Sequence, residues 1–127
     1  GPERAVRMSP TGDALRCNLP FTLHNDTFVT PIDPLLLVWS AVNRLSYGGR
    51  DLGKAEQGIP VLEALKGITI NAARQGFEEG VKGSIEPGKF ADFVVLDENP
   101  LAVDPMHLKD IEIAATIVGD VLAYGAL

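Results

Sequence analysis

Cysteine and histidine are scarce in this sequence, and their scarcity limits the chemistry that it can support. The single cysteine, Cys17, cannot form an intramolecular disulfide, which argues against a disulfide-rich secreted scaffold. The two histidines, His24 and His107, lie far apart in the chain. A catalytic zinc ion needs three protein ligands, usually including two histidines at short spacing, so the chain is not expected to bind zinc by itself.

Clusters of basic residues and long apolar runs are also missing. The net charge of −6 and the pI near 4.8 argue against nucleic acid or an anionic membrane as a partner, and favour small molecules or proteins. No apolar run approaches the roughly 20 residues of a transmembrane helix. No phosphate-binding pattern of the G-x-x-x-x-G-K-S/T type is present. We expect a cytoplasmic location, and the signals that would decide it lie in the natural N-terminus, which this sequence does not include.

What the sequence does contain is typical of one globular domain. Its 127 residues are 46% hydrophobic and 22% charged, and a domain of this size buries roughly 65–70% of the surface of its unfolded chain. Neither a disulfide nor a structural metal is therefore needed for stability. The chain starts with Gly1-Pro2 and without methionine, so we expect it to be an internal cut from a longer protein.

The first residues predict a helix followed by a strand. Ser9 can cap a helix that has Pro10 at its first position, and Asn18 can end it because asparagine tolerates the left-handed conformation. The apolar run Leu19–Leu23 then predicts a short buried strand. That strand would present three polar residues, 24–26, at its C-terminal end.

Two further helical segments are predicted before residue 80. Asp33-Pro34 combines an N-cap with a proline in the first turn, and Gly48-Gly49 is expected to stop this helix. A polar stretch follows over residues 50–58, and Pro60 opens one or two more helices. Apolar residues on one face of the helix that starts at Asp33-Pro34 are Leu35, Val38, Trp39, Val42 and Leu45.

The chain changes from helix-rich to strand-rich near residue 80. Pro87-Gly88 fits the central positions of a type II turn, and Gly119-Asp120 fits a two-residue hairpin. Asp104-Pro105 predicts the start of one more short helix. We therefore expect two structural contexts, over residues 1–80 and 81–127. The predicted strands lie within Ser84-Ile85, Phe90–Leu96 and Ile111–Tyr124.

The polar residues 24–26 are the best candidates for chemistry. Polar groups at the C-terminal end of a buried strand face the crevice in which α/β folds bind ligands. Taken without context, however, such a tripeptide is more often a strand that runs into a turn, with Asp26 capping the backbone. Cys17 has no obvious base nearby, and His107 on a short helix is expected to be a surface or packing residue.

Two motifs resemble a known family, the amidohydrolase superfamily. The stretch from Pro20 to Leu35, PFTLHNDTFVTPIDPL, resembles the eighth barrel strand of the YtcJ-like branch, in which HSD is followed by a loop ending in PPDPL. The stretch from Lys82 to Leu96, KGSIEPGKFADFVVL, is similar to the segment that returns from the barrel into the small β domain of amidohydrolases at large. The resemblance covers nearly the whole chain.

The resemblance implies a role for two residues. Asp26 matches the family aspartate that lies beside the metal and exchanges protons with the attacking water. His24 matches a family histidine, for which we expect a supporting role in the second layer around the metal or in strand packing. Asn25 replaces the usual serine, and Thr27-Phe28 replaces smaller residues, which leaves substrate preference open. Residues 86–88 are expected to be structural.

The expected fold is an α+β fragment of a larger enzyme. It would comprise the last βα unit and helices of a TIM barrel over residues 1–80, and part of a small β-sandwich domain over 81–127. The parent is expected to be a metal-dependent hydrolase of non-peptide, amide-like C–N bonds that uses a divalent metal such as zinc. The remaining ligands would lie upstream, so the fragment should bind no metal, be inactive and self-associate. Two rivals stay open, a regulatory or protein-binding module of the kind linked to exoenzyme production, and a purely structural domain.

Overall fold

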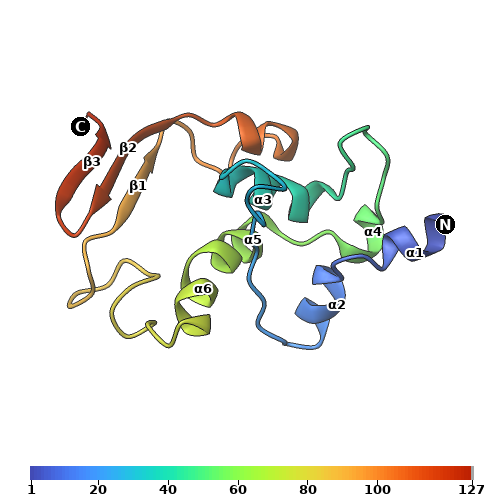
Figure 1. The fold of residues 1–127 in the computed structure, drawn as a ribbon, viewed down its shortest axis with the longest axis horizontal. Coiled ribbons are helices and arrows are strands. Elements are labelled where there is room, and N and C mark those ends of the chain that lie inside the picture. The colour runs from blue at the N-terminus through green and yellow to red at the C-terminus, as the bar shows by residue number, and fades with distance from the viewer. Residues whose placement is uncertain (127) are drawn as a thin grey trace.

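The computed structural model describes residues 1–126 as a row of short helices with a small sheet at one end (Figure 1). The sheet and the N-terminal helix lie at opposite ends of the longest axis, with α3 and α5 between them. None of the helices in the described chain combines the length and the apolar character that crossing a bilayer requires. The elements are α1 (Pro2–Val6), α2 (Thr11–Arg16), α3 (Pro34–Asn43), α4 (Lys54–Gln57), α5 (Val61–Ile68), α6 (Ile70–Gln75), β1 (Phe93–Leu96), the 3-10 helix η1 (Pro105–Asp110), β2 (Ile113–Val118) and β3 (Val121–Gly125).

Helix α3 is the centre of the hydrophobic core. It begins as the sequence predicts, because the Asp33 carboxylate accepts a hydrogen bond from Leu36 N at 3.0 Å and Pro34 occupies the first turn. Apolar side chains at helical spacing pack against residues from α5, η1 and the segments beside them. The buried members of this core are Leu35, Val38, Ala41, Val42, Ile59, Ala64, Leu108 and Ile111.

The end of α3 differs from the prediction. The helix stops at Asn43, and the next residue, Arg44, adopts the left-handed conformation with φ of 53°. Gly48-Gly49 was expected to end the helix but lies in the loop that follows. The Arg44 guanidinium donates to the carbonyl oxygens of Met8, Ser9 and Leu52, and these bonds hold the chain away from the helix axis. Because they join segments distant in sequence, no local pattern could have predicted them.

Two side chains of α3 attach η1 to the helical part of the molecule. Asn43 Nδ2 donates to Pro105 O at 2.7 Å, and Trp39 Nε1 donates to Met106 O at 3.0 Å. Asn43 is fully buried, so breaking its bond would leave a buried polar group without a partner. The predicted helix start at Asp104-Pro105 is confirmed, although the helix is of the 3-10 type and Asp104 Oδ1 accepts from Met106 N.

Helices α2 and α4 touch closely. The predicted helix is confirmed as α2, and Asn18 adopts the left-handed conformation after its end as expected. The predicted cap is wrong, because Pro10 is the N-cap residue and the Ser9 side chain does not cap the helix. A Cβ atom at Gly12 would lie 2.4 Å from Glu56 O, so only glycine allows this contact. Gln57 is buried there and accepts from Asp13 N at 3.0 Å. The sequence did not predict α4, which lies in the polar stretch 50–58.

The predicted strand over Leu19–Leu23 does not form within residues 1–126. The segment is extended, but its backbone bonds in the described chain are Leu19 N to Ala14 O and Leu23 N to Gly67 O, and Leu19 is 60% exposed. A strand requires a neighbour whose N–H and C=O groups complete the ladder. No segment of the described chain takes that place beside it, so the prediction is wrong for the chain as it stands.

The sheet is antiparallel with the strand order β1-β2-β3. The predicted hairpin is confirmed, because Gly119 and Asp120 have φ of 56° and 68° and join the pair Val118 and Val121. The predicted turn at Pro87-Gly88 is also confirmed, with Gly88 at φ of 92°. Ser84-Ile85 is not a strand, since it lies in the turn-rich stretch between α6 and β1 where no neighbouring strand pairs with it.

We expect the substitution Leu108→Ala to lower the free energy of unfolding of the chain by about 2–5 kcal/mol. Leu108 is fully buried in the core around α3, so truncation would leave a cavity. Urea unfolding followed by the fluorescence of Trp39, the one tryptophan, measures the change. The matched control Leu101→Ala removes an exposed leucine and should change stability by less than about 0.5 kcal/mol. Equal losses in the two variants would contradict this description of the core.

We also expect the isolated chain to self-associate between low and high micromolar concentration. Strand β3 is exposed along its whole length at the edge of the sheet, and its apolar residues include Val121 and Leu122. Sedimentation equilibrium measures the association. Val121→Lys should weaken it by placing a charge on the edge strand, whereas Ala72→Lys adds the same charge on exposed α6 and should not. A monomer over the whole range would refute the expectation.

Candidate functional site

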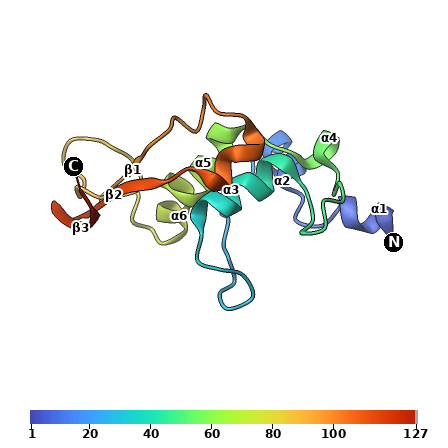
Figure 2. The same cartoon turned by 90° about the horizontal axis from the view of Figure 1, so that it is seen from above.

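The two site residues predicted from the sequence lie at the end of the extended segment that precedes α3. His24 and Asp26 are both exposed. Asp26 has φ of 49°, a left-handed conformation that aspartate tolerates better than most residues. It begins a turn closed by Val29 N, which donates to Asp26 O at 2.7 Å. The backbone thus holds the Asp26 carboxylate at the start of a defined loop that projects from the body of the molecule (Figure 2).

The neck of this loop is closed by Asn25. When its amide is oriented so that oxygen meets a donor and nitrogen meets an acceptor, Nδ2 donates to Pro31 O at 3.3 Å and Oδ1 accepts from Asp33 N at 3.1 Å. The Thr30 hydroxyl donates to Asn25 O as well. The two sides of the loop are therefore joined beside Asp33, the residue that caps α3. Sequence reasoning noted Asn25 only as a replacement for serine, and its contacts six and eight residues away give it a positioning role.

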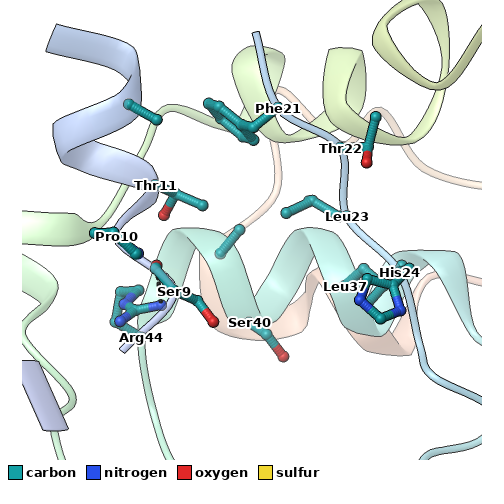
Figure 3. Close-up of a pocket in the computed structure, with 12 residues that line it drawn as sticks. Ser9, Pro10, Thr11, Phe21, Thr22, Leu23, His24, Leu37, Ser40 and Arg44 are labelled. Atoms are coloured by element: carbon teal, nitrogen blue, oxygen red, sulfur yellow. Dashed lines mark hydrogen bonds between the residues drawn. The ribbon is translucent and has the colours of Figure 1, made fainter. Parts of the chain in front are cut away.

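A pocket of about 440 Å³ lies between α2, the extended segment and α3 (Figure 3). Phe21, Leu23 and Leu37 give it apolar walls. His24 and Arg44 lie at opposite ends, with the Ser40 hydroxyl on α3 between them. Asp26 is not among the lining residues. The structure therefore places His24 at the pocket rim and leaves the Asp26 carboxylate to the projecting loop.

Arg44 is the buried charge of this pocket, and sequence reasoning did not select it. Its side chain is 7% exposed, and desolvation by burial lowers the pKa of the guanidinium, while the nearby Asp51 carboxylate raises it. The two terminal nitrogens donate to backbone carbonyls, and Nε has no hydrogen-bond partner among the residues described. Arg44 thus serves mainly as a cross-link between the end of α3, the segment that joins α1 to α2, and the loop before α4.

A second hollow, of about 330 Å³, lies between the same extended segment and α6. Asn71 Nδ2 donates to Phe21 O at 3.1 Å, and the Thr22 hydroxyl donates to Gln75 Oε1 at 2.9 Å. These side chains, rather than a neighbouring strand, hold the extended segment against α6. Hollow space therefore lies along residues 20–24 both beside α2 and α3 and beside α6.

The residues described do not form a metal site by themselves. No group of three or more His, Cys, Asp or Glu side chains gathers anywhere in residues 1–126. His107 lies exposed on η1, and Cys17 lies exposed at the end of α2 as a free thiol. His24 and Asp26 are two residues apart, but a metal held there would need further ligands. What the arrangement offers is one exposed carboxylate in a fixed turn, with an imidazole nearby in sequence.

The chain is similar in sequence to parts of known proteins. The chain is 37% identical over 103 residues to YtcJ of Bacillus subtilis, whose name designates it an amidohydrolase, and this match covers 79% of the chain and 19% of the relative. It is 29% identical over 119 residues to an N-substituted formamide deformylase of Arthrobacter pascens, covering 94% of the chain and 22% of the relative.

A solved structure also matches the fold. It is an uncharacterized metal-dependent hydrolase of Pyrococcus horikoshii, with a TM-score of 0.70 and 30% identity, and the match covers 84% of this chain and 22% of that one. The chain thus has the length of only about a fifth of the proteins it matches. The sequence pattern of the amidohydrolase family extends over residues 1–124, and the chain therefore belongs to the amidohydrolase family.

Proposed function

We propose that this chain is the C-terminal part of a metal-dependent hydrolase that acts on non-peptide, amide-like C–N bonds of a small molecule. The observation that carries the proposal is the exposed Asp26 carboxylate, fixed by its turn at the end of an extended segment in a chain that belongs to the amidohydrolases. The deformylase of Arthrobacter pascens, whose name specifies hydrolysis of a C–N bond, matches the chain across this region and beyond it.

Asp26 is proposed to move the proton in this reaction. Its carboxylate would accept a proton from water as the water oxygen attacks the amide carbon, and would return that proton to the nitrogen as the C–N bond breaks. A carboxylate suits both steps because it can accept the proton and is regenerated when it returns that proton. Its exposed position leaves the oxygens free to reach a substrate. His24, at the rim of the neighbouring pocket, would support this geometry.

A divalent metal, proposed to be zinc, would be held mainly by residues outside this chain, because the described residues do not form a site alone. When bound, such an ion would lower the pKa of its water toward neutrality. Asp26 is the carboxylate that this chain would add beside the ion. Without the missing ligands, the chain by itself should have no activity.

The remainder of the protein is proposed to complete a TIM barrel around the extended segment. Residues 20–24 would become its eighth strand, and no strand of the described chain pairs with this segment, which leaves its edges to strands from the rest of the protein. Residues 1–80 would belong to the barrel, and residues 81–127 would contribute the strands β1, β2 and β3 to a small β-sandwich domain. The exposure of β3 suits such an incomplete sheet.

We expect the isolated chain to show no stoichiometric zinc binding tighter than micromolar. Two histidines that lie in different parts of the chain and one exposed aspartate do not make a tetrahedral site. Isothermal calorimetry with zinc alone measures the binding. The variant His107→Ala serves as a control, because it leaves His24 and Asp26 in place. Any weak heat from binding at the surface should be similar in this variant and in the unchanged chain. A one-to-one site with submicromolar affinity would show that the ligand set has been misjudged.

In the full-length protein, Asp26→Asn should reduce kcat/KM on a formamide substrate by about 100-fold or more, because asparagine cannot accept and return the proton. Far-ultraviolet circular dichroism should remain unchanged, because the side chain is exposed. Asp97→Asn removes another exposed aspartate carboxylate, in the turn after β1, and should leave kcat/KM within about twofold. If Asp26→Asn keeps near wild-type turnover, Asp26 does not take part in the reaction.

A further inference from the structure

The loop that follows Asp26 exposes apolar side chains where a solvent-facing loop would carry polar ones. Phe28 is 101% exposed, Val29 is 78% exposed and Ile32 is 79% exposed. The intervening residues Thr27, Thr30 and Pro31 carry no charge. Burial of these side chains, against another part of the protein or against a ligand, would be favourable, and their neighbours decide which of the two the loop suits.

The shape of this loop is fixed by its own hydrogen bonds. Val29 N donates to Asp26 O at 2.7 Å at the tip, and the Asn25 amide joins Pro31 O and Asp33 N at the neck. The Asp33 side chain in turn caps α3. A loop that is ordered before it meets a ligand loses little conformational entropy on binding, which favours affinity for the group that fits it.

The apolar side chains also lie next to the proposed reacting carboxylate. Asp26 and Val29 are the first and last residues of one turn, so their Cα atoms are within about 7 Å of each other. Phe28 is a central residue of the same turn. A molecule whose scissile bond reaches the Asp26 carboxylate therefore has its neighbouring substituent within reach of this loop.

We propose that the loop Thr27–Ile32 selects substrates whose scissile nitrogen carries an apolar substituent. This inference rests on the proposed function and names its substrate class. The relative from Arthrobacter pascens acts, by its name, on N-substituted formamides, and a formamide has only hydrogen on its carbonyl carbon. The group that differs between such substrates is therefore the one on nitrogen. Phe28, Val29 and Ile32 provide contact area for an alkyl or aryl group there.

Charge supports the same selection. The loop offers no cation, and it is bounded at its two ends by the carboxylates of Asp26 and Asp33. An anionic substituent would meet like charge, and within Thr27–Ile32 a neutral polar one would find no hydrogen-bonding side chain beyond the threonines. The loop thus both attracts an apolar group and disfavours a negatively charged one.

The test compares two isosteric amides on the full-length protein, N-butylformamide and N-(2-methoxyethyl)formamide. The wild-type protein should prefer the butyl compound by about tenfold or more in kcat/KM, which is the range that one methylene in an apolar site provides. In Phe28→Ser this preference should fall to about twofold, and Phe28→Leu should keep most of it. The matched control Phe77→Ser removes an exposed phenylalanine after α6 and should leave the preference unchanged.

A binding measurement gives a readout that does not require turnover. The substitution Phe28→4-fluorophenylalanine, made in the Asp26→Asn variant of the full-length protein, places a fluorine label on the loop. Titration with the butyl compound should move the fluorine resonance with a Kd about tenfold lower than the methoxyethyl compound gives. A label at Phe77 should not respond. If the fluorine resonance moves when the protein concentration is raised but not when either ligand is added, the loop contacts another copy of the protein and the inference is overturned.

The outcomes for the two proposals are separable. Turnover of both amides at equal rates, with no effect of Phe28→Ser on their ratio, would overturn the apolar selection and leave the hydrolase proposal standing. Absence of turnover together with selective binding of the butyl compound would overturn the hydrolase proposal and keep the selection. Absence of both turnover and binding would overturn both.

Discussion

The attachment of η1 to α3 is the interaction on which the arrangement of the rest depends. Leu108 enters the core around α3, and the side chains of Asn43 and Trp39 donate to the backbone of η1. The same helix begins at Asp33, the residue at the neck of the loop that carries Asp26. Helix α3, a rigid element of ten residues, thus holds the loop at the N-terminal end of the helix. Along its side it holds η1, which leads into strand β2.

Features set by neighbouring residues could be predicted from the sequence. Asp33-Pro34 and Gly119-Asp120 form the cap and the hairpin that their side chains favour, because the competing conformations cost more within the same few residues. The prediction of a strand over Leu19–Leu23 was wrong because a strand depends on a partner strand, which the described chain does not supply. The end of α3 was misplaced because Arg44 bonds to carbonyl groups from two other segments.

In the candidate site, too, features set by nearby residues could be predicted and features set by contacts with more distant residues could not. Asp26 could be selected from the resemblance to the family and from its place after an apolar run, and the family is now established. The contacts of Asn25 to Pro31 and Asp33 depend on the loop returning to its own start, which spacing alone does not reveal. The exposure of Phe28 could not be predicted either, because apolar residues in a loop are equally compatible with packing against the core.

The hydrogen bonds of Asn25 separate the path of the loop backbone from the identity of the side chains at its tip, so that evolution could change the side chains alone. Because the neck is held by backbone groups of Pro31 and Asp33, the side chains at the tip contribute little to the path of the chain. Exchange of residues 27, 28, 29 and 32 would therefore be expected to leave the backbone at Asp26 in place. Side chains on a loop whose ends are held in this way can vary without a change in the backbone that carries them, so relatives with different residues there could differ in what they bind.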